Sequence, residues 1–146
     1  MLLNPKQLEM VEAVAKRIKE EKQAAARCQI DFGEPFRWLL HGGPGTGKSH
    51  VIRVLKDRLF KEVLHWDLGI GFQIVALQAV MADLLGGDTI HHACGIPVYK
   101  RTQNKQTDEQ KTIDIAKRVL QWRWFIIDVI SMVATAFTAL VPSVMV

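Results

Sequence analysis

The chain has 146 residues, of which 49% are hydrophobic and 23% are charged. This composition excludes a fibre and wholesale disorder, and a chain of this length can form one domain whose core needs no disulfide or structural metal. The two cysteines do not make a secreted disulfide framework, and the net charge of +4 permits a polyanionic partner without requiring one. We therefore expect one intracellular globular domain.

The first element is predicted to be an amphipathic helix that runs to about Ala26. Asn4 is a common helix cap, Pro5 suits the first helical position, and Gln7 lies where a capping-box partner reaches back. Apolar residues at helical spacing predict its buried face at Leu8, Val11, Ala15 and Ile18.

Strand and helix patterns then alternate along the chain. Apolar runs predict strands over residues 36–41, 72–77 and 124–130, the last ending around Asp128. Helical spacing predicts a helix after Gly47 with Val51, Ile52, Leu55, Leu59 and Phe60 buried and with Arg53, Lys56, Asp57 and Lys61 outside. It predicts further helices over Ala79–Leu85 and 112–120. The polar residues 99–111 are interpreted as an exposed insertion. This alternation predicts an α/β fold with a parallel sheet between layers of helices.

Residues 42–49 read Gly-Gly-Pro-Gly-Thr-Gly-Lys-Ser and match the phosphate-binding pattern G-x-x-x-x-G-K-[ST] between a predicted strand and helix. The glycines let backbone N–H groups surround a phosphate chain, and the helix start adds its positive dipole end. Lys48 is expected to contact the β- and γ-phosphates and Ser49 to join the Mg²⁺ shell. The remaining nucleotide-binding residues are Gly43, Gly45, Thr46 and Gly47. The alternative is a glycine-rich turn that happens to precede a helix.

An acidic residue at the tip of a neighbouring strand usually completes such a site. Asp128 follows four apolar residues, and we predict that it holds Mg²⁺ through water and, with Lys48, is a catalytic residue. A helix cap or a surface residue would give the same pattern. The next residue, Val129, cannot orient and deprotonate an attacking water as a carboxylate does in ATPases.

Four segments in this order resemble the Pif-one/RecD-type DNA helicases of superfamily 1. They are Leu-Asn-Pro-Lys-Gln at 3–7, the loop at 42–49, Gly-Asp-Thr-Ile-His at 87–91 and Ile-Ile-Asp-Val-Ile-Ser-Met at 126–132. The resemblance implies a RecA-like P-loop NTPase lobe that uses ATP and Mg²⁺ to unwind duplex DNA in the 5′-to-3′ direction. It implies single-stranded or forked DNA as partner, and a location in the nucleus or mitochondrion of a eukaryote or otherwise in the cytoplasm.

The resemblance covers residues 1–132, which we expect to form an incomplete first lobe, with 133–146 as an apolar continuation. The second lobe, which such an enzyme needs to enclose ATP, is not expected within this sequence. The uncharged stretch 129–146 is long enough for a transmembrane segment. Because buried segments of α/β proteins look alike and polar residues dilute this stretch, we expect no membrane span.

The resemblance also assigns roles to single residues. Gln7 would read the adenine edge, whereas the residues themselves predict a capping role equally well. Thr89 and His91 would approach the DNA strand; alternatively, Thr89 caps a helix and His91 packs beneath it. His91, His92 and Cys94 lack a second ligand pair at zinc spacing, so we expect no metal site there.

The sequence departs from the family in two places. Relatives have Glu where this chain has Val129, and losing a general base costs about 10²–10⁴ in rate. Residues 76–82 read Ala-Leu-Gln-Ala-Val-Met-Ala where many relatives have A-P-T-G-x-A-A, which removes the Gly and Thr of that DNA contact. The predicted helicase is therefore a fragment or divergent copy, and the alternative is a catalytically inactive nucleotide-binding module.

The tryptophans near the last strand have two interpretations. Trp122 and Trp124 flank Arg123 and could stack on bases. Because they enter a buried strand, we expect them to pack in the core.

Overall fold

The computed structural model describes residues 3–29, 33–40, 45–96, 105–128 and 144–145. Its strands form one sheet in the order β2-β1-β3-β4, and every neighbouring pair is parallel. The strands are β1 (Phe72–Ala76), β2 (Asp88–Thr89), β3 (Trp124–Asp128) and β4 (Val144–Met145). The helices are α1 (Pro5–Ala26), α2 (Lys48–Val54), the π-helix η1 (Leu55–Val63), α3 (Ala79–Leu85), α4 (Ile90–Cys94) and α5 (Lys105–Val119). The predicted α/β fold with a parallel sheet is confirmed.

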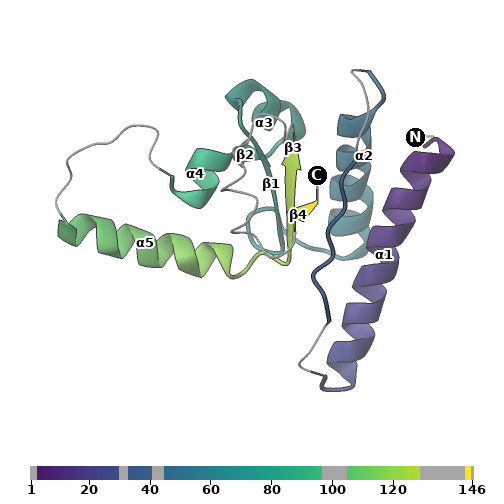
Figure 1. Cartoon of the computed structure of the whole chain (residues 1–146), viewed down its shortest axis with the longest axis horizontal. Coiled ribbons are helices and arrows are strands. Elements are labelled where there is room, and N and C mark those ends of the chain that lie inside the picture. The colour runs from purple at the N-terminus through teal and green to yellow at the C-terminus, as the bar shows by residue number, and fades with distance from the viewer. Residues whose placement is uncertain (1–2, 30–32, 41–44, 97–104, 129–143, 146) are drawn as a thin grey trace.

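The sheet lies between two groups of helices, with α1 and α2 on one side and α4 and α5 on the other (Figure 1). β1 and β3 pair in register from Phe72 opposite Trp124 to Ala76 opposite Asp128. Since alternate residues of a strand point to opposite faces of the sheet, each strand contributes side chains to a core on either face. Every residue of both strands is buried, as expected for a parallel sheet covered on both faces.

The larger core lies between the sheet and the first two helices. Its members come from α1, α2, η1, β1 and β3: Met10, Val14, Ile18, Val51, Ile52, Leu55, Phe60, Phe72, Ile74, Trp124 and Ile126, with Leu85 from the end of α3. The smaller core covers the opposite face with Val75, Ile90, Ala93, Phe125 and Ile127. Phe60 is at the centre of the larger core, with its ring centroid 4.7 Å from that of Phe72 and 5.7 Å from that of Trp66.

α1 begins where its capping signals predict and ends at Ala26, as expected. The capping box is complete: Gln7 N donates to Asn4 Oδ1 at 2.9 Å, and Asn4 N donates to Gln7 Oε1 at 3.0 Å. The buried stripe follows the i, i+4, i+8 positions Met10, Val14 and Ile18. It contains the predicted Ile18, whereas Val11 and Ala15, also predicted to be buried, are half-buried. The prediction that Leu8 is buried is wrong, since this side chain is 45% exposed on the neighbouring face.

The segment before the phosphate loop is extended without forming the predicted strand. Within the described residues 36–40, only Trp38 makes a β-bridge, and half-buried residues alternate with exposed ones. Aromatic packing holds the segment on the sheet, because the Phe36 ring lies 6.0 Å from that of Trp38 and 5.4 Å from that of Trp124. The rest of the predicted strand, His41, lies outside the described residues.

Two further predictions need correction. Residues 105–111, interpreted as part of an exposed insertion, belong to α5, because Lys, Gln and Glu favour helix as readily as they favour solvent. The helix after Gly47 continues as the π-helix η1, in which Leu59 is only half-buried. The remainder of the predicted insertion, 99–104, lies outside the described residues.

The tryptophans pack in the core as expected. Trp124 is 3% exposed, and Trp122 stacks on Phe125 at 5.5 Å while its Nε1 donates to Gly69 O at 2.8 Å. Within the described ranges, none of the helices combines the length and apolar character that crossing a bilayer requires. Residues 129–143 lie outside that description, so the interpretation of the uncharged stretch stays a prediction.

Candidate functional site

The described part of the phosphate loop turns through two left-handed glycines into a helix. Gly45 has φ 76° and Gly47 has φ 83°, conformations that glycine adopts without strain. Gly47 occupies the N-cap position of α2, where no side chain forms a capping hydrogen bond. Its carbonyl accepts hydrogen bonds from His50 N at 3.1 Å and from Val51 N at 3.2 Å. Lys48 is therefore the first helical residue, as the phosphate-binding pattern requires, and Ser49 follows it. Residues 42–44, which include Gly43, lie outside the described residues.

Gln7 connects the start of α1 to this loop. Its Nε2 donates to Thr46 O at 3.1 Å, a contact between residues 39 positions apart in the sequence. The approach is close, because a Cβ at Gly47 would lie 2.6 Å from the same nitrogen. The structure therefore shows the predicted capping role, and it also places the side chain on the loop that the sequence assigns to phosphate.

Asp128 ends β3 and is buried. It pairs in register with Ala76, the last residue of β1, and is 5% exposed. The start of α2 lies at the same end of the sheet as the carboxyl end of β3 (Figure 1). Ligands of parallel α/β sheets bind at this end of the strands. The structure thus brings Gln7, Thr46, Lys48 and Asp128 to one end of the molecule. Val129 lies outside the described residues.

The segment 87–91 is organised around the start of α4. Thr89 caps this helix, since its Oγ1 accepts from His92 N at 3.3 Å, as the alternative interpretation of this residue predicts. The Asp88 carboxylate accepts from Thr89 N at 2.7 Å and pairs with the His92 ring. His91 is half-buried. No group of three or more His, Cys, Asp and Glu side chains in the described parts of the chain could hold a metal ion.

Two cations of the helix that follows the loop donate to α3. Arg53 is exposed, as predicted, whereas the Lys56 side chain, which was predicted on the outside, is only 14% exposed. Arg53 Nη2 donates to Leu84 O at 3.2 Å, and Lys56 Nζ donates to Leu85 O at 2.7 Å. Charged donors at carbonyls of the last helical turn are favourable, because those carbonyls lack partners within the helix. Local sequence carries no signal for such contacts, which span 31 and 29 residues.

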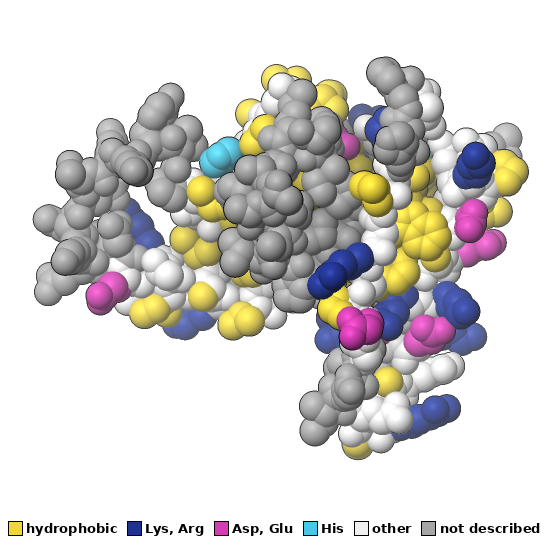
Figure 2. Space-filling model, in the orientation of Figure 1, with side chains coloured by type: hydrophobic (Ala, Val, Ile, Leu, Met, Phe, Trp, Pro, Cys, Tyr) yellow, Lys and Arg dark blue, Asp and Glu magenta, His cyan; other side chains and the backbone are white. Residues whose placement is uncertain are grey.

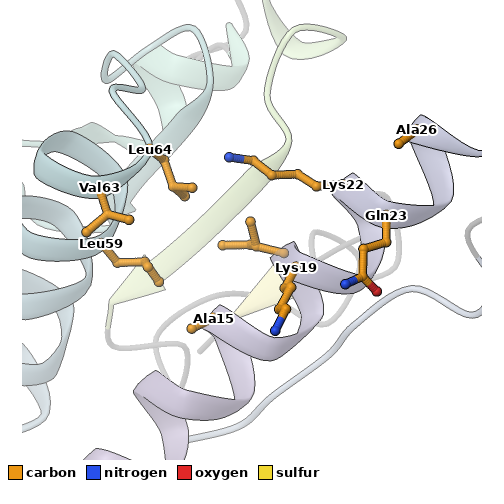
Figure 3. A pocket seen from close by; sticks show the side chains of 9 residues that line it. Ala15, Lys19, Lys22, Gln23, Ala26, Leu59, Val63 and Leu64 are labelled. Carbon is orange, nitrogen blue, oxygen red and sulfur yellow. The ribbon is translucent and has the colours of Figure 1, made fainter.

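An apolar groove lies elsewhere, between the second half of α1 and η1 (Figure 3). It has a volume of about 400 Å³ and is lined by Ala15, Ile18, Lys19, Lys22, Gln23, Ala26, Leu59, Val63 and Leu64. Its α1 residues begin roughly two turns beyond Gln7 along that helix. The groove is therefore separate from the phosphate loop.

The parallel sheet and the helices on its two sides form an α/β domain with a RecA-like fold. Among solved structures, the chain is similar to the Pif1 helicase from Candida albicans, with a TM-score of 0.62 and 23% identity. The match covers 95% of this chain and 27% of that chain, so this chain spans about a quarter of the helicase's length. No protein-family model and no curated protein matches the sequence. At this identity the likeness shows the fold.

Proposed function

We propose that this chain is the ATP-binding part of a DNA helicase similar to Pif1. The observation that carries the proposal is the sequence Gly-Thr-Gly-Lys-Ser at 45–49, which turns through two left-handed glycines into the start of α2. The buried Asp128 at the same end of the sheet supports it, and so does the helicase fold.

The residues fit a nucleotide with its Mg²⁺. Backbone N–H groups of Gly43, Gly45, Thr46 and Gly47 would surround the phosphates, and the Lys48 ammonium would neutralise them. The Ser49 hydroxyl and the Asp128 carboxylate are hard oxygen donors of the kind that Mg²⁺ prefers, and the metal would neutralise phosphate charge. Gln7 completes the set from α1. Thr89 and His91 are proposed to face the DNA strand.

Calorimetric titration with ATP–Mg²⁺ tests the nucleotide site. Replacing Lys48→Ala removes charge-assisted hydrogen bonds worth about 1.5–3 kcal/mol, so we expect affinity to fall roughly 10- to 150-fold. The matched control is Lys61→Ala, since Lys61 lies on η1 with its side chain 49% exposed. Its affinity should equal that of the original chain. Equal affinities in all three proteins would overturn the proposal.

A second candidate function is a nucleotide-binding module without catalysis. Val129 supports it, because this apolar side chain cannot act as the base that a helicase ATPase uses. Steady-state ATP turnover of the original chain and of Val129→Glu separates the two functions. Turnover that rises in the variant favours a divergent helicase, whereas negligible turnover in both, with ATP still bound, favours the binding module.

DNA binding by this chain is proposed to be weak and sensitive to salt. On the face that Figure 2 shows, Lys and Arg side chains are interspersed with Asp and Glu over the α1 side, so few cations of that face can contact phosphates together. Affinity that depends on released counterions falls steeply as salt rises. A fluorescent oligonucleotide that binds equally well at low and high salt would contradict this mode of binding.

A further inference from the structure

The groove between the second half of α1 and η1 is lined by apolar side chains that are only partly covered (Figure 3). Ile18 is 3% exposed, and Leu59 and Leu64 are half-buried; we call these three residues the floor of the groove. Val63 lines the groove as well, and this side chain is 66% exposed. Apolar surface that is open to water is stabilised when another apolar surface covers it.

The α1 wall of the groove has the form of a docking site for a helix. Its lining residues are at positions 15, 18, 19, 22, 23 and 26, a spacing that places them along one face of α1. At about 1.5 Å per residue this face is roughly 17 Å long, or about three helical turns. A helix that docks in a groove between two others places its apolar anchors at i, i+3, i+4 and i+7. An open groove of this length therefore suits a short amphipathic helix.

The groove also carries positive charge. Lys19 and Lys22 line it from α1, and no Asp or Glu is among its lining residues. Within the ranges that the structure describes, neither lysine makes a hydrogen bond or an ion pair. Figure 3 shows the Lys22 side chain extending from α1 toward Leu64 on the other wall. A ligand on the floor would therefore meet two ammonium groups at its edge.

Acidic side chains of the same two helices do not neutralise these lysines. Glu21 pairs with Arg17 at 3.0 Å, Glu62 pairs with Arg58 at 2.9 Å, and Glu20 does not line the groove. The whole chain has a net charge of +4, so a second copy would add positive charge, whereas an acidic partner is electrostatically complementary.

We propose that this groove binds an amphipathic helix of a separate, acidic polypeptide. The apolar face of that helix covers the floor and Val63, and Asp or Glu residues at its edge pair with Lys19 and Lys22. The inference is independent of the proposed nucleotide site, because the groove begins roughly two turns beyond Gln7 along α1.

Two designed helical peptides of about 15 residues test the inference, because this length covers the α1 wall. Both have leucines at i, i+4, i+7 and i+11, and the residues beside the leucines are Glu in one peptide and Lys in the other. Fluorescence anisotropy measures the binding of each labelled peptide to the whole chain. We expect the Glu peptide to bind saturably and the Lys peptide to bind at least roughly 4-fold more weakly, since two attractive charge pairs become repulsive.

Three variants locate the binding. Lys22→Glu should weaken binding of the Glu peptide by roughly 2- to 30-fold and strengthen binding of the Lys peptide. Lys61→Glu is the matched control, because it changes the net charge equally at an exposed position of η1 outside the groove, and it should leave both affinities unchanged. Val63→Asn should weaken binding of both peptides by roughly 5- to 10-fold. This variant should stay folded, because Val63 is largely exposed.

The inference is overturned if the Glu peptide does not bind saturably, if the two peptides bind equally, or if Lys22→Glu and Lys61→Glu lose the same affinity. Sedimentation of the chain alone tests the other occupant, and we expect a monomer. A dimer that Val63→Asn dissociates would show that a second copy fills the groove, and would overturn the inference as well.

Discussion

Gly87 lies between α3 and β2, within the segment 87–91 that resembles a helicase motif, and the structure gives it a steric role. A Cβ at this position would lie 2.4 Å from the carbonyl oxygen of Ile74 and 3.0 Å from its carbon. Gly87 does not have a positive φ, so a side chain there would meet a clash without backbone strain. Replacing Gly87→Ala therefore tests how closely β2 packs against β1.

The size of the effect follows from what must move. Ordinary van der Waals contact begins at 3.4 Å, so the new methyl group would be about 1 Å too close to backbone that β1 fixes. β2 must then move away, which weakens the pairs Val75 with Asp88 and Ala76 with Thr89. Overpacking of this kind costs about 1–3 kcal/mol, which for a chain of this size lowers the melting temperature by roughly 3–12 °C.

Thermal and urea unfolding, followed by tryptophan fluorescence, measure this cost. The control is Gly33, whose φ is +70° and whose Cβ would meet nothing within 4 Å. Gly33→Ala should destabilise the protein by about 1–2 kcal/mol through backbone strain alone. Gly33→Asn should destabilise it much less, because Asn tolerates the left-handed region. At Gly87, Asn should destabilise at least as much as Ala. A Gly87→Ala protein that melts within about 1 °C of the original would refute the steric reasoning.

Three further predictions concern the core, the α3 contacts and the cysteines. Phe60→Ala should destabilise by about 3–5 kcal/mol in urea unfolding, because the ring is fully buried among other aromatic rings; a loss below 1 kcal/mol would contradict that packing. Lys56→Met should lower the free energy of unfolding by about 1–3 kcal/mol, because it leaves the Leu85 carbonyl of α3 without its charged donor. Lys61→Met should change the free energy of unfolding by no more than about 0.5 kcal/mol. Equal effects of the two substitutions would refute the capping role of Lys56. Burial raises the pKa of Cys94, so less of its thiolate forms near pH 8. Mass spectrometry should therefore find that iodoacetamide alkylates Cys94 more slowly than the exposed Cys28. The alkylation rate of Cys94 should still rise at higher pH. Equal alkylation rates would contradict this.

Local signals in the sequence predicted the elements whose causes are local. Asn4, Pro5 and Gln7 predicted the start of α1, and the apolar run before Asp128 predicted β3. The pattern at Ala79–Leu85 predicted α3 with its observed bounds. Caps, glycines and apolar periodicity act within a few residues, so a single sequence contains them.

The candidate site could be predicted in part. The loop at 42–49 is a local pattern, and so is a carboxylate after four apolar residues. That the described residues 45–49 lie at the same end of the sheet as Asp128 depends on how α2 packs against β3. The core residues that make this contact, Val51 and Ile52 with Trp124 and Ile126, are far apart in the sequence. For residues 105–111 the sequence did not distinguish a loop from a helix, because polar residues of this composition are compatible with both.

Only the tertiary structure decided which side chains meet across the fold. The sequence marked Gln7 for capping or for adenine, and the structure adds a hydrogen bond to Thr46, 39 residues away. The structure also shows that Lys56, which was expected on the surface, donates to the Leu85 carbonyl at the end of α3. The physical reason is that periodicity identifies which face of a helix is apolar, whereas the neighbour of a polar group depends on how the helices pack against the sheet.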